Sequence, residues 1–171
     1  YPYNIYENTN FISMGFAYDK YVSYQDLESI NDVNRGNVLV RALAVDKEIL
    51  DKYSLPLAEI TDSELYDYTY TTFITDVTKR KNMSTYCFNQ TKDGFECNIV
   101  LNQPNLVYFS VPYDEGFTAY VNGEKAEIEK VNYAMSAVYV PAGDNEIVFK
   151  YKTPWLNSAI ALTAAGWAVY C

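Results

Sequence analysis

The stretch FTAYVNGEKAEI, residues 117–128, constrains the fold most strongly, because apolar and polar residues alternate on both sides of an Asn-Gly pair. A two-residue type I′ turn needs positive φ at its central positions, which Asn and Gly tolerate, and alternation gives each strand one buried face. The stretch therefore predicts a tight β-hairpin. Because a hairpin has no chemistry of its own, its role depends on what surrounds it.

Further segments that resemble strands follow from Leu65 onward. They are YDYTYTTFITDVT at 66–78, LVYFSV at 106–111, AVYV at 137–140 and EIVFKY at 146–151. β-Branched and aromatic residues fill these segments, and turn residues such as Pro104-Asn105 and the stretch 141–144 separate them. About seven or eight short strands at this spacing predict an antiparallel β-sandwich or jelly roll.

The first 63 residues mix loop with helix. Ser23 followed by Asp26 is typical of a capping box that opens a short helix. The apolar stretch 37–53 predicts a longer helix with a break near Asp46. A buried strand over 38–45 is the alternative, because the apolar residues are too dense there for their spacing to distinguish a helix from a strand. We favour the helix.

These segments predict a mainly β protein with some α (α+β), in one compact body. We expect a mixed loop and helix lobe over 1–63, packed on an antiparallel β-sandwich over 64–153. The 13 residues 159–171 carry no charge and are fewer than the roughly 20 needed to span a bilayer. We expect 154–171 to be the start of a membrane helix in a longer protein; the alternative is an ordinary helix packed on the core.

Charge and composition exclude several functions. The 22 acidic and 13 basic residues give a net charge of −9, with no basic stripe to bind phosphates, so a nucleic-acid partner is not expected. The chain has no His, which excludes His-based catalysis and His-ligated metals. We expect no metal and no cofactor. The 18 Tyr residues favour a binding surface, including one for sugars, although Tyr is also a good strand residue.

Cys87 and Cys97 flank a predicted turn at Lys92, Asp93 and Gly94. A hairpin centred there places the two cysteines opposite each other, where they could form a disulfide in an oxidising compartment. Two reduced thiols are the alternative. Cys171 is terminal and adds no information.

The stretch 106–162 resembles the C-terminal extracytoplasmic segment of the YfhO family of bacterial multi-pass membrane proteins. The matching motifs are Gly116-Phe117, Val121-Asn122-Gly123, Val131-Asn132-Tyr133, Pro141-Ala142-Gly143 and Phe149-Lys150-Tyr151, and residues 5–21 are similar to a Tyr-Glu-Asn stretch of the family. Each motif alone is short, and their order and spacing carry the resemblance.

The resemblance implies an accessory domain on the extracytoplasmic face of the bacterial plasma membrane. The parent would be a glycosyltransferase that uses polyprenyl-phosphate sugars and glycosylates cell-wall polymers such as lipoteichoic acid in Gram-positive bacteria. Its catalytic residues would lie outside this chain, and its membrane-embedded remainder would be the partner of this domain. The outer face would also favour the disulfide between Cys87 and Cys97.

Five residues beside the hairpin are candidates for contact with a teichoic acid or a polyprenyl-linked sugar: Tyr113, Asp114, Glu115, Asn132 and Tyr133. Aromatic faces stack on sugar rings, and carboxylates and amides bind the hydroxyl groups. A purely structural domain that caps the membrane part is the alternative. A glycoside hydrolase would need two carboxylates at a defined separation, and no spacing in the sequence singles out a pair.

Overall fold

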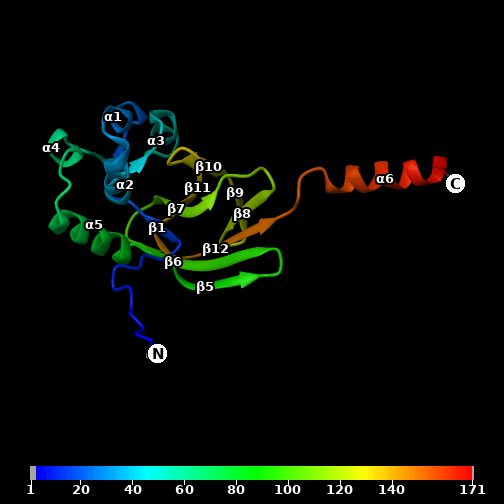
Figure 1. The fold of residues 1–171 in the computed structure, drawn as a ribbon, viewed down its shortest axis with the longest axis horizontal. Helices are drawn as coiled ribbons and strands as arrows, with labels where there is room; N and C mark the ends of the chain where they lie inside the picture. The colour runs from blue at the N-terminus through cyan, green and yellow to red at the C-terminus, as the bar shows by residue number, and fades with distance from the viewer. Residues whose placement is uncertain (1–2, 171) are drawn as a thin grey trace.

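The structure is a computed structural model and describes residues 3–170, with two antiparallel sheets at its centre (Figure 1). The first has the strand order β1-β7-β11-β10 and the second the order β5-β6-β12-β8-β9. The first sheet comprises β1 (Gly15–Ala17), β7 (Asn105–Pro112), β11 (Met135–Val140) and β10 (Ile128–Val131). The second comprises β5 (Tyr86–Thr91), β6 (Gly94–Leu101), β12 (Gly143–Tyr151), β8 (Phe117–Val121) and β9 (Glu124–Ala126).

The main core lies between these two sheets, which confirms the predicted sandwich. Inward-facing residues alternate along each strand, as Ile147 and Phe149 do on β12, while Glu146 and Lys150 on the same strand are exposed. Phe149 stacks on Phe95 with ring centroids 4.8 Å apart. Phe, Val and Ile side chains that leave water here supply the main driving force for folding.

The opening hairpin has the predicted turn. Asn122 and Gly123 have φ of 53° and 82°, and β8 pairs with β9 in the register Val121 to Glu124. The Asn122 side chain also accepts a hydrogen bond from the Glu146 backbone amide at 3.0 Å, which ties the turn to β12. The Asn-Gly pair therefore sets both the turn and its contact with the central strand of this sheet.

A helical lobe covers the outer face of the first sheet at one end of the sandwich (Figure 1). It contains α1 (Tyr24–Ser29), α2 (Asp32–Arg41), α3 (Lys47–Tyr53), α4 (Asp62–Leu65) and α5 (Tyr70–Asn82), with a small parallel sheet of β2 (Lys20–Val22), β3 (Leu43–Ala44) and β4 (Ala58–Glu59). The Ser23 hydroxyl accepts a hydrogen bond from the Asp26 amide at 3.0 Å, as predicted for the start of α1.

The stretch 37–53 is not one helix. It forms the end of α2, then β3, then α3, which begins after Asp46. The predicted break near Asp46 is therefore present, and the alternative strand is correct only for Leu43 and Ala44. These two buried residues continue the parallel sheet beside β2, a contact that the local sequence does not encode.

The strand predicted over 66–78 is wrong, because most of this stretch lies in α5. Thr69 caps the helix by accepting a hydrogen bond from the Thr72 amide at 3.3 Å. Asp76 then forms a buried ion pair with Arg41 of α2, Nε to Oδ2 2.8 Å. Tyr and Thr favour strands locally, and here the helix cap and packing against α2 outweigh that preference.

The C-terminal helix α6 (Leu156–Tyr170) projects away from the end of the body opposite the helical lobe (Figure 1). Every described side chain from Thr153 onward is exposed, including Trp155 and Trp167. The helix therefore does not pack on the core, which was the alternative for this segment. Within the described residues, no helix has both the length and the apolar character needed to cross a membrane.

Candidate functional site

Two hollows lie near Glu129 on β10, which lines the first and accepts hydrogen bonds from Lys52 and Tyr53 of the second. The first, of about 420 Å³, is lined by Tyr24 of α1, Tyr133 in the β10–β11 turn and Glu129. The second, of about 710 Å³, is lined by Tyr53 at the end of α3 and by Tyr139 on β11. Tyr24, Tyr133, Glu129, Lys52, Tyr53 and Tyr139 are called the tyrosine–carboxylate strip below.

The four tyrosines of the strip form two pairs. The rings of Tyr24 and Tyr133 are tilted, with centroids 5.3 Å apart, and the Tyr24 hydroxyl accepts a hydrogen bond from the Tyr133 amide at 3.3 Å. The rings of Tyr53 and Tyr139 are stacked, with centroids 4.9 Å apart. Helices of the lobe thus supply one ring of each pair and the first sheet supplies the other.

Glu129 is the charged centre of the strip. Its Oε1 accepts hydrogen bonds from the Tyr53 hydroxyl at 2.6 Å and from Lys52 Nζ at 2.7 Å. Lys52 also forms an ion pair with Glu127 at 2.8 Å, and these two carboxylates raise the pKa of the ammonium above its usual value. Lys52 is therefore a fixed cation that bridges the side chains of Glu127 and Glu129 beside the second hollow.

Two phenols of the strip, those of Tyr53 and Tyr24, have pKa values above the usual range and are neutral at physiological pH. Burial raises the pKa of Tyr53 to about 12, and its hydrogen bond to Glu129 adds to the shift. Burial also raises the pKa of Tyr24, and the Asp46 carboxylate contributes in the same direction, against the hydrogen bond from Tyr133. The strip therefore combines neutral aromatic rings with carboxylates, which suits an uncharged ligand rich in hydroxyl groups.

The residues expected to contact a ligand are only partly brought together. Tyr133 lies in the strip and is 41% exposed. Tyr113 is exposed, and its amide donates to the Ala134 carbonyl at 2.7 Å, so its backbone lies beside the same turn. Asp114 and Glu115 form the turn before β8, where Asp114 Oδ1 accepts a hydrogen bond from the Gly116 amide at 2.7 Å.

Asn132 is a structural residue in this fold, which corrects its expected role in ligand contact. Its side chain is buried, its Oδ1 accepts from the Ala44 amide at 2.8 Å, and its Nδ2 donates to the Tyr18 hydroxyl at 3.4 Å. The amide is used within the protein, so it is not available to a ligand. The sequence does not single out the other members of the strip: the high tyrosine content is the only signal for Tyr24, Tyr53 and Tyr139, and no signal indicates Glu129.

The cysteine pair is not joined in the structure. Tyr86 pairs with Asn98, but a bulge shifts the register before Asn89 pairs with Glu96. Cys87 lies in this bulge with φ of 50° and is exposed, whereas Cys97 is buried, and both are free thiols. The bulge turns Cys87 away from the core position that Cys97 occupies, so the expected disulfide is absent here.

Among residues 3–170, no group of three or more Cys, Asp or Glu side chains is placed to hold a metal ion.

The family model described as "Bacterial membrane protein YfhO" matches residues 57–163. The chain belongs to the YfhO family. It is also similar to the "Uncharacterized protein YfhO" of Bacillus subtilis (strain 168), with 26% identity over 114 residues, which is 66% of this chain. The alignment spans 13% of the length of that relative. No solved structure matches this chain.

The YfhO match runs from β4 into α6 and includes every strand of the two sandwich sheets except β1. It therefore includes Glu129, Tyr133 and Tyr139 of the tyrosine–carboxylate strip, which lie on the first sheet and its turn. Tyr24 and Tyr53 lie before the match begins, on helices of the lobe. The sheet half of the strip thus belongs to the part of this chain that marks it as a YfhO protein.

Proposed function

We propose that this chain is an extracytoplasmic accessory domain of a membrane-embedded protein of the glycosyltransferase type, and that the tyrosine–carboxylate strip binds a sugar of its acceptor glycan. The observation that carries the proposal is the arrangement of two tyrosine pairs around Glu129. The Tyr53–Tyr139 pair contacts Glu129 through the Tyr53 hydroxyl, and the Tyr24–Tyr133 pair lines the same hollow as Glu129. Aromatic rings stack on the apolar faces of sugars, while carboxylates accept hydrogen bonds from their hydroxyl groups.

The charge of the strip indicates which sugars fit. The carboxylates that line the two hollows are Glu28, Asp46, Glu124, Glu127 and Glu129, and the ammonium groups are Lys52, Lys125 and Lys130. Like charges repel, so this excess of carboxylates disfavours phosphate groups and acidic sugars. We therefore expect a neutral hexose or an N-acetylhexosamine, presented on a teichoic acid or a polyprenyl-linked donor, with the phosphates outside the strip.

Hydrolysis is not proposed. A glycoside hydrolase needs one carboxylic acid that can give a proton and a second carboxylate in the same cleft. Glu129 is the buried carboxylate of the strip, and its Oε1 already accepts hydrogen bonds from both Lys52 and Tyr53. A carboxylate held in this way can bind a sugar hydroxyl but is poorly suited to protonate a leaving group.

A structural role is the second candidate. The alignment covers 13% of the Bacillus subtilis relative, so most of such a protein lies outside this chain and could pack on the strip. In that case the same tyrosines would contact other extracytoplasmic parts of the polypeptide, and no sugar would bind. The two candidates therefore make opposite predictions for the isolated chain.

Glycan binding tests the proposal directly. A glycan array is screened with the 171-residue chain, and the strongest neutral glycan is then titrated by calorimetry. We expect Tyr133→Ala and Tyr24→Ala to weaken binding about tenfold or more, which corresponds to ~1.4 kcal/mol. Tyr70→Ala is the matched control, because Tyr70 is 74% exposed on α5 and lies outside both hollows. No binding to any glycan would favour the structural role.

A further inference from the structure

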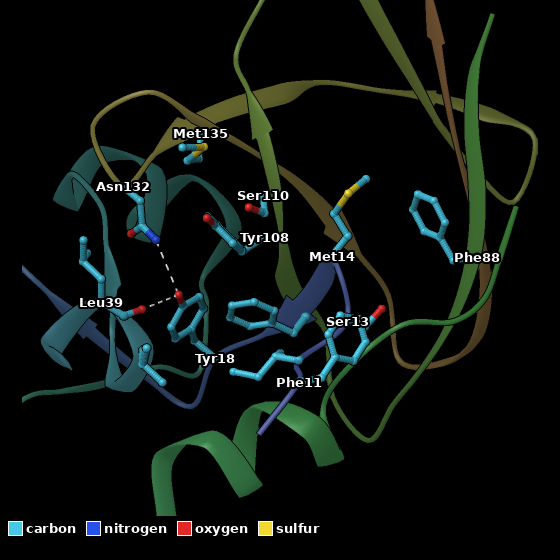
Figure 2. A pocket seen from close by; sticks show the side chains of 13 residues that line it. Phe11, Ser13, Met14, Tyr18, Leu39, Phe88, Tyr108, Ser110, Asn132 and Met135 are labelled. Carbon is cyan, nitrogen blue, oxygen red and sulfur yellow. Dashed lines mark hydrogen bonds between the residues drawn. The ribbon is translucent and has the colours of Figure 1, made fainter. Parts of the chain in front are cut away.

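A third hollow, of about 740 Å³, lies on the outer side of the first sheet (Figure 2). Its walls come from the segment 11–14 before β1, from α2, β5 and β7, and from the turn into β11. Figure 2 shows Leu39 and Asn132 at one end and Phe88 at the other, with Tyr108 and Ser110 between them. Its size falls in the range of about 300–1,000 Å³ that is typical of small-molecule sites.

The lining of this apolar hollow contains no Asp, Glu, Lys or Arg, although 20% of the chain is charged. Its two tyrosines, Tyr18 and Tyr108, are uncharged at physiological pH, because burial raises the pKa of both phenols. Most of the remaining lining is Phe, Ile, Leu, Val and Met. A charged ligand would therefore lose its hydration here without gaining a counter-ion.

The polar groups of the lining are mostly paired within the protein. The Tyr18 hydroxyl donates to the Leu39 carbonyl at 2.6 Å, and Ser13 Oγ lies 2.9 Å from Thr85 Oγ1. Asn132 is held by Ala44 and Tyr18, as described above. A ligand thus finds few free donors or acceptors in this hollow, which favours an apolar surface over one rich in hydroxyl groups.

We propose that the apolar hollow binds the hydrocarbon chain of a membrane lipid. Its uncharged lining and internally paired polar groups match a hydrocarbon and match neither a sugar nor an anion. Met14 and Met135 line it, and flexible thioether side chains adapt to a chain of variable shape. Membrane lipids are available as ligands because the family consists of membrane proteins. This site is separate from the tyrosine–carboxylate strip, so either proposal can fail without the other.

The probe is N-phenyl-1-naphthylamine, an uncharged dye whose fluorescence rises in apolar surroundings. We expect the 171-residue chain to bind it saturably and to release it when octanol, decanol or dodecanol is added. The affinity of these alcohols should rise by up to about fourfold per methylene, which corresponds to ~0.8 kcal/mol, until the hollow is full. Analytical ultracentrifugation at the same concentrations reports whether the chain stays monomeric.

Ser110→Trp tests the location, because Ser110 is exposed on β7 and a larger side chain there would occupy the hollow. Val100→Trp is the matched control, since Val100 is 58% exposed on β6 and does not line the hollow. We expect Ser110→Trp to weaken dye binding at least tenfold and Val100→Trp to leave it unchanged. If Ser110→Trp fails to fold by circular dichroism, Met14→Asp should give the same loss by placing a charge in the lining.

Three results would overturn the proposal. The first is the absence of saturable dye binding to the folded chain. The second is equal binding by the hollow variants and the control. The third is dye binding that disappears as the chain dimerises, because the hollow would then be an interface between two copies.

Discussion

Asn132 and Ala44 form a reciprocal pair of hydrogen bonds between the sandwich and the helical lobe. The Asn132 backbone N–H donates to the Ala44 carbonyl at 2.9 Å, and the Ala44 backbone N–H donates to the side-chain Oδ1 of Asn132 at 2.8 Å. Asn132 adopts φ of 45°, a left-handed conformation that Asn tolerates better than most residues. The backbone and side chain of this one residue thus join β3 of the lobe to the β10–β11 turn, next to Tyr133 of the strip.

Asn132→Ala should destabilise the fold by about 1–3 kcal/mol, because it leaves the buried Ala44 amide without an acceptor. Urea denaturation followed by circular dichroism measures the change. Asn102→Ala is the control, since Asn102 is exposed and its loss should cost less than about 0.5 kcal/mol. Equal stability of the two variants would show that the reciprocal pair does not hold the lobe in place.

Acid should destabilise the chain through two carboxyl groups of the lobe. Burial alone would raise the pKa of Asp19, but the Arg80 guanidinium and Lys79 hold it below its usual value of 3.8. A hydrogen bond from Lys20 likewise lowers the pKa of Glu64 from 4.5. The unfolded chain therefore takes up protons more readily than the folded one, so this stability is present above about pH 4.5 and is lost as the pH falls.

The free energy of unfolding, measured in urea from pH 6 to pH 3, should decrease below pH 4.5. In the double variant Asp19→Asn and Glu64→Gln the decrease should be smaller, by less than about 1 kcal/mol for each pair, because both carboxylates are partly exposed. A double variant with the same pH dependence as the original chain would show that other groups cause the acid sensitivity.

Thiol reactivity should separate the two cysteines of the second sheet. Burial raises the pKa of Cys97 to about 12, whereas Cys87 is exposed in the bulge of β5. In a Cys171→Ser background, one thiol should react with Ellman's reagent at pH 8 in the folded chain, and a second should react only in denaturant. Adding Cys87→Ser should abolish the reaction of the folded chain. An intact mass lower by two hydrogens, with no reactive thiol, would show a disulfide instead.

Strands with clear alternation and turn residues could be predicted from the sequence. The hairpin at Asn122-Gly123 and the two faces of β12 follow from local rules that hold in the folded protein. The region of α5 could not be predicted in this way. Its helix depends on contacts with α2, including the pair of Asp76 with Arg41, which are distant in the sequence.

The candidate site shows the same division between local and distant information. Tyr133 was named because it lies in a motif beside the hairpin, but its partner Tyr24 is 109 residues away in the chain. Glu129 looks like any exposed residue of an alternating strand until Lys52 and Tyr53 of α3 are placed against it. Single residues of a site can therefore be found by motif, whereas their partners require the fold.

Sugar binding by the tyrosine–carboxylate strip is tested most directly by NMR. The chain, labelled with ¹³C on its tyrosine rings, is titrated with the strongest neutral glycan from the array. We expect saturable shifts at Tyr24, Tyr133, Tyr53 and Tyr139, while Tyr70 and Tyr66, which are exposed elsewhere, stay unchanged. Tyrosine variants of the strip assign each signal. Shifts confined to tyrosines outside the strip, or no shift at saturating glycan, would contradict sugar binding by the strip.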